Sequence, residues 1–183
     1  MRLTSLVLAI AALAIGVAAQ TTPAPAPTNP FANTFNLTVT PIVLPGNQQT
    51  VAGAMIGGTF NLTPNVALRE TNLLAPGNNF SGYYGGVNYN IPKLANAINN
   101  ASTTINGFNL MPYVTASAGV GRVTPSSGPT QSHYSAMGGA GLAYAPAGSK
   151  TFQLSLIEVQ GLRAPGLHSG WTVVVSSGVK LSF

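Results

Sequence analysis

Charged residues are scarce in this sequence. Its 183 residues include 7 lysines and arginines and 2 acids, so charged residues make up 5% of the chain, whereas soluble domains average roughly 25%. This composition excludes a coiled coil and an ordinary cytosolic enzyme. The bases are scattered singly and form no stripe that follows a phosphate backbone, so we expect no nucleic-acid partner.

Cysteine is absent, which excludes a disulfide scaffold and a cysteine-ligated zinc site. The two histidines, His133 and His168, and the two acids, Glu70 and Glu158, are too dispersed to offer metal-ligand spacing. We therefore expect neither a metal nor another cofactor.

Long apolar runs are also absent after the first residues. Residues 1–19 combine the basic Arg2, an apolar stretch from Leu6 to Val17 and the small Ala19 before Gln20, which predicts a cleaved secretory signal peptide. The run is too short for a membrane-spanning helix, and no later stretch is long enough for one. Residues 20–33, rich in Pro, Ala and Thr, predict an extended lead-in to a domain over 34–183.

The rest of the chain is divided into short segments by Pro, Gly and Asn. Alternating apolar and polar residues with β-branched and aromatic enrichment predict a strand in each segment. Strands of about 10 residues suit a tilted bilayer crossing. The eight predicted strands cover 34–44, 50–62, 65–74, 79–91, 108–123, 133–144, 151–162 and 171–183.

The two faces of these strands differ in an unusual way. In the last segment Val173 and Val175 share an apolar face, while Thr172 and Ser176 share the other. A soluble sandwich would carry Lys, Glu, Arg and Asp on its polar face. Thr, Ser, Asn and Gly suit a small closed interior instead, and an apolar exterior suits lipid. We predict an all-β, eight-stranded, antiparallel, up-and-down transmembrane β-barrel.

Aromatic residues gather near the predicted strand ends, as interfacial girdles require. With both termini on the periplasmic side, Phe80, Tyr83, Tyr134 and Trp171 fall near the outer ends. The residues near the periplasmic ends are Phe35, Phe60, Tyr89, Phe108, Tyr113, Tyr144, Phe152 and Phe183.

The final strand, WTVVVSSGVKLSF, ends on Phe183, and the run PYVTASAGVGRV covers 112–123. The chain resembles the small outer-membrane barrels of the outer-membrane protein A family in these two segments, in its strand count and in its aromatic girdles. The resemblance implies a monomer in a bacterial outer membrane, in contact with lipid and lipopolysaccharide. It also implies that Phe183 is the recognition signal for the barrel-assembly machinery.

Three places depart from a regular barrel. The long periplasmic connection over 92–107 is either a short helix, from the spacing of Leu94 and Ile98, or a disordered loop. In the seventh strand the apolar residues change from one face to the other, which predicts a bulge near Ser155 and Leu156 that turns Glu158 and Gln160 inward. The adjacent Arg69 and Glu70 cannot both point inward, so we expect a bulge or a register near the rim.

The inward charges are the main candidates for function. Arg69 (or Glu70), Glu158 and Lys180 are expected to form a buried ion-pair network in the lumen. Eight strands enclose an interior just wide enough for side chains, so the sequence favours a packed plug. A selective polar pathway for small solutes is the alternative.

Two other functions remain open from the sequence. The run His133-Tyr134-Ser135 resembles the His-x-Ser element of outer-membrane lipid A deacylases, although no acid lies nearby to orient the histidine. Sequons at Asn36, Asn61, Asn79 and Asn100 fit a secreted β-rich filament subunit that assembles by strand addition. We expect a structural or surface-interaction role without catalysis.

Overall fold

The computed structural model describes residues 35–46, 49–101, 108–146, 151–165, 167 and 169–182. The predicted signal peptide (1–19), the lead-in and the assembly signal Phe183 lie outside the described residues. His168 lies outside them too.

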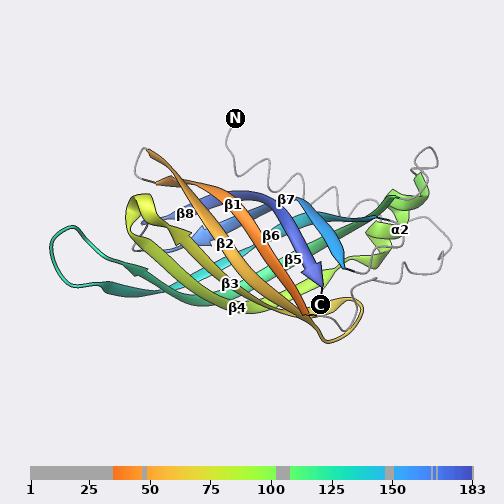
Figure 1. Ribbon diagram of the computed structural model, residues 1–183, viewed down its shortest axis with the longest axis horizontal. Coiled ribbons are helices and arrows are strands. Elements are labelled where there is room, and N and C mark those ends of the chain that lie inside the picture. Colours follow the sequence, from red (N-terminus) through yellow and green to blue (C-terminus); the bar gives the residue numbers. More distant parts are fainter. Residues whose placement is uncertain are drawn as a thin grey trace.

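Eight strands form one closed, antiparallel barrel (Figure 1). Each strand pairs with its neighbours in chain order, and each overlaps the segment predicted for it, so the predicted fold class is confirmed. The strands are β1 (Phe35–Gly46), β2 (Gln49–Asn61), β3 (Val66–Ala75), β4 (Phe80–Asn90), β5 (Phe108–Val123), β6 (Gln131–Pro146), β7 (Phe152–Arg163) and β8 (Trp171–Ser182).

The barrel is closed by pairing between the first and last strands. β1 runs antiparallel to β8, with Leu37 opposite Leu181 and Val43 opposite Val175. A closed sheet leaves no strand edge for another chain to extend. The filament hypothesis, which requires strand addition, therefore loses its structural basis.

Side chains alternate between the lumen and the outer face, as the sequence predicts. In β4, Tyr84 and Asn88 are buried inside, whereas Tyr83 and Val87 are about half exposed outside. The same alternation continues through β5, where Thr115 is buried and Val114 is exposed. The outer face is thus the more apolar of the two.

The two ends of the barrel differ. The β5–β6 hairpin reaches beyond the other strands at one end, and α2 (Pro92–Ala101) lies at the other (Figure 1). The Asn99 side chain accepts from the backbone N–H of Leu110 at 3.0 Å and donates to its carbonyl at 3.1 Å, which ties α2 to β5. The helical alternative is confirmed over 92–101. Within the described residues, no helix is long and apolar enough to cross a membrane.

A bulge interrupts β7 where the parity of the sequence changes. The pairing with β6 passes from Ile157, opposite Leu142, to Ser155, opposite Ala143, so Leu156 has no partner. Leu156 and Ile157 are consequently both exposed on the outer face. The predicted bulge is confirmed, and it turns Glu158 and Gln160 into the lumen.

Some glycines allow neighbouring strands to approach closely. A Cβ added at Gly139 would lie 2.0 Å from the carbonyl oxygen of Val159 and 2.7 Å from the Cα of Gln160. Both atoms belong to the backbone of β7, so relief would require moving the strand. A Cβ at Gly85, in contrast, would meet no atom within 4 Å.

We expect Gly139→Ala to destabilise the barrel by about 1–3 kcal/mol because it overpacks the β6–β7 contact. Gly85→Ala is the matched control and should leave stability unchanged or slightly raised, since its Cβ enters open space. Urea unfolding of refolded protein measures both. Equal midpoints for the two variants would contradict this assignment.

Candidate functional site

A buried ion pair joins opposite sides of the barrel. Nη1 of Arg69, on β3, lies 2.5 Å from Oε1 of Glu158, on β7, and the two side chains are 9% and 3% exposed. Glu70, the next residue, is exposed on the outer face. The register of β3 against β4 is continuous from Val66 to Ala75. The expectation of a bulge or a rim position for this pair was therefore wrong, because simple alternation sends the two charges to opposite faces in mid-strand.

Several donors converge on the carboxylate of Glu158. The Tyr113 hydroxyl donates to Oε2 at 3.0 Å, and Nε2 of Gln160 donates to Oε1 at 2.7 Å. Nε2 of Gln160 also lies 3.2 Å from the Thr115 hydroxyl, and the Tyr113 hydroxyl lies 3.0 Å from that of Ser155. These bonds offset the cost of removing the carboxylate from water.

Lys180 joins this cluster through an aromatic ring. Its Nζ lies 4.6 Å from the centroid of the Tyr113 ring, within the range of a cation–π interaction. Arg69, Glu158 and Lys180, the lumen charges expected from the sequence, are thus brought together around Tyr113. The sequence predicts Tyr113 in an aromatic girdle, but the structure buries it inside the barrel at 1% exposure.

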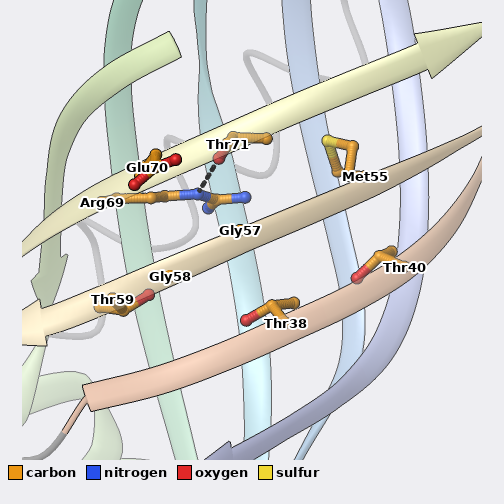
Figure 2. Close-up of a pocket in the computed structure, with 9 residues that line it drawn as sticks. All are labelled: Thr38, Thr40, Met55, Gly57, Gly58, Thr59, Arg69, Glu70 and Thr71. Carbon is orange, nitrogen blue, oxygen red and sulfur yellow. Dashed lines mark hydrogen bonds between the residues drawn. The ribbon is translucent and has the colours of Figure 1, made fainter. Parts of the chain in front are cut away.

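The Arg69 side chain extends along the inner wall. Its Nε donates to the Thr71 hydroxyl at 3.0 Å, the bond drawn in Figure 2. A small cavity beside it has room for about one water molecule. The residues that line it are Thr38, Thr40, Met55, Gly57, Gly58, Thr59, Arg69, Glu70 and Thr71 (Figure 2).

Apolar side chains fill the lumen on the hairpin side of the ion pair. The sequence predicts mainly Thr, Ser, Asn and Gly there and Phe80 in the outer girdle; both predictions were wrong for this part of the lumen. Apolar residues at inward positions, such as Met55 and Met137, could have revealed this plug. The buried cluster consists of Met55, Leu73, Ala75, Phe80, Tyr84, Met137, Leu162, Ala164, Leu167 and Val174.

The remaining girdle candidates occupy different positions. Phe60, Tyr89 and Trp171 are 53%, 45% and 60% exposed on the outer face. Tyr144 and Phe152 are partly exposed. The backbone of Phe35 pairs with Phe60, and its side chain lies outside the description.

The deacylase-like residues do not assemble a hydrolytic site. Ser135 is buried, and its hydroxyl donates to the backbone carbonyl of His133 at 3.4 Å. Glu158 is bound to Arg69, and Glu70 lies on the outer face, so neither acid orients the histidine. Among the described residues, no three His, Asp or Glu side chains group as metal ligands.

The barrel geometry matches solved structures of small barrels. The N-terminal β-barrel domain of Pseudomonas aeruginosa OprF aligns with a TM-score of 0.54 and 18% identity, over 83% of this chain and 98% of that one. Neisserial surface protein A aligns with a TM-score of 0.52 and 14% identity, over 82% and 96%. This chain has the fold of the small outer-membrane β-barrels.

The fold expected from the sequence resemblance is therefore confirmed. Because the identities are low, the likeness to these structures shows the fold alone. No family model matches the chain, and no curated protein sequence matches it. The eight strands and their closure carry the likeness.

We expect Glu158→Gln to destabilise the barrel by about 3–5 kcal/mol, because it leaves the buried charges of Arg69 and Lys180 without their counter-charge. Glu70→Gln is the same substitution at the acid on the outer face, which is not the counter-charge of a buried base, and should not lower stability. Urea unfolding in lipid vesicles, followed by the fluorescence of Trp171, the single tryptophan, measures both. Indistinguishable midpoints would contradict the role of the ion pair.

Proposed function

We propose that the chain spans a bacterial outer membrane as a closed barrel and has a structural or surface-interaction role rather than a catalytic one. The observation that carries this proposal is the distribution of side chains. Large apolar residues are exposed all around the wall, while the ion pair is buried inside. Lipid favours such an exterior, and a closed barrel satisfies every strand backbone within it.

Aromatic side chains on the outer face support a membrane-spanning barrel. Phe60 and Tyr89 lie toward the α2 end, and Tyr134 and Trp171 lie toward the hairpin end, where Tyr134 is 91% exposed. We assign these aromatics to two interfacial girdles. We place the α2 end, where β1 begins and β8 ends, in the periplasm, in line with the placement of the termini expected from the sequence, so the β5–β6 hairpin faces outward and is available for surface contacts.

Lipid and lipopolysaccharide are the proposed partners of the outer wall. The barrel-assembly machinery is the proposed partner during biogenesis, with Phe183 as its recognition residue. Export through a cleaved signal peptide belongs to the same proposal. These assignments rest on the sequence and on the resemblance it carries.

We expect the refolded protein in detergent to migrate anomalously on a gel until it is boiled. A closed barrel resists unfolding by the detergent at room temperature, whereas heating separates its strands. The control is the same protein boiled before loading. A protein that fractionates without detergent and shows no heat-dependent shift would contradict the membrane barrel.

The lumen contents favour a closed barrel over a small-solute channel. We expect no conductance for the wild-type protein in planar bilayers, because the apolar plug and the ion-pair network fill the interior. Replacing Leu73 and Leu162, both 0% exposed, with alanine should create a cavity and raise conductance. The matched control replaces the outward Leu68 and Leu74. Steady wild-type currents would support the channel instead.

A further inference from the structure

One charged side chain stands on the apolar wall. Glu70 occupies the middle of the ten-residue strand β3 and is exposed on the outer face. Its cross-strand partners are Gly58 on β2 and Gly85 on β4. No side chain stands directly beside it on either neighbouring strand.

Most side chains around Glu70 are apolar, apart from Asn72 on the same strand and Tyr83, which lies opposite Asn72 on β4. Leu68 and Leu74, on the same strand, are 47% and 43% exposed. On the adjoining strands, Ile56 is 40% exposed and Val87 is 46% exposed. Under the proposed function this band faces hydrocarbon, where an ionisable side chain is costly and marks a functional site.

Glu70 has a polar companion on the same face. Nδ2 of Asn72 donates to Oε1 of Glu70 at 3.3 Å. The amide of Asn72 also has a second N–H and a carbonyl oxygen, and the carboxyl group has a second oxygen. The pair thus offers donors and acceptors together, so it is complementary to a copy of itself.

Gly85 leaves room for close approach. A Cβ there would meet nothing within 4 Å, so no side chain covers the outer surface on the β4 side of Glu70. A neighbouring molecule can therefore bring its own side chains directly onto Glu70 and Asn72. In lipid, such polar contacts between chains are retained because hydrocarbon offers no alternative partner.

We propose that a second copy of this chain packs against β3, around a two-fold axis normal to the membrane that passes beside Glu70 and Asn72. Two copies in the same orientation keep each residue at its own depth, so Glu70 and Asn72 meet their counterparts. The outward bases Arg122 and Arg163 lie at the hairpin-side ends of β5 and β7, away from this depth. The inference rests on the proposed membrane barrel and departs from the monomer expected from the sequence.

The test uses the absence of cysteine from the chain. Leu68→Cys places a thiol beside the proposed axis, and Ala140→Cys places one at an exposed outer position of β6. Oxidation in native outer membranes should cross-link Leu68→Cys into a homodimer and leave Ala140→Cys monomeric. Equal cross-linking of both variants, or of neither, would overturn the proposal.

Two further substitutions in the Leu68→Cys background test the contact itself. Glu70→Leu removes the polar pair, and Gly85→Phe places a bulky side chain on the open surface beside it; each should abolish the cross-linked dimer. Ala140→Phe is the matched control for bulk and should leave it intact. Cross-linking that survives both interface changes would refute the role of this patch.

Each variant is also run on the gel with and without heating. A retained heat-dependent shift shows that the barrel is folded, so loss of the dimer then reports on the interface. Absence of the shift in the Leu68→Cys parent would count against the membrane barrel itself. A cross-link from Leu68→Cys to a different protein, with no homodimer, would assign the patch to another partner and reject the second copy.

Discussion

Closure of the sheet is the constraint on which the rest of this structure depends. Pairing between β1 and β8 gives the edge strands partners, which allows a wall of apolar side chains to meet lipid without exposing unsatisfied backbone groups. Closure with eight strands also makes the interior narrow. Any charge placed there must find its partner across a few ångströms, as Arg69 and Glu158 do.

The ion pair and the apolar plug have complementary effects on the lumen. Buried charges contribute little net stability, but removal of one partner is strongly unfavourable. Arg69 and Glu158 can meet because the strand order places β3 opposite β7, and a shift of register would separate them. The plug around Leu73 and Leu162 supplies the apolar contacts that the polar cluster cannot.

The strand positions and the barrel itself were predictable because apolar and polar residues alternate with a period of two in each segment. The bulge near Ser155 is also visible in the sequence, as a change in which positions are apolar. The sequence did not predict which of Arg69 and Glu70 faces inward, because local alternation fixes only that the two side chains point to opposite faces. Tyr113 and Phe80 were misassigned for a related reason. Their positions near strand ends suit a girdle, but alternation along each strand puts Tyr113 on the inward face of Thr115 and Phe80 on the inward face of Tyr84.

The bulge in β7 takes up one extra residue of that strand. Before it, Gln153 and Ser155 face inward at odd positions; after it, Glu158 and Gln160 face inward at even ones. Loss of a single residue at Leu156 would restore uniform alternation and leave the strand locally more regular. Glu158 would stay inside in that variant, whereas regular pairing of the full strand, with Leu156 kept, would turn it toward the lipid. In this strand, a local defect in pairing is what keeps the counter-charge inside.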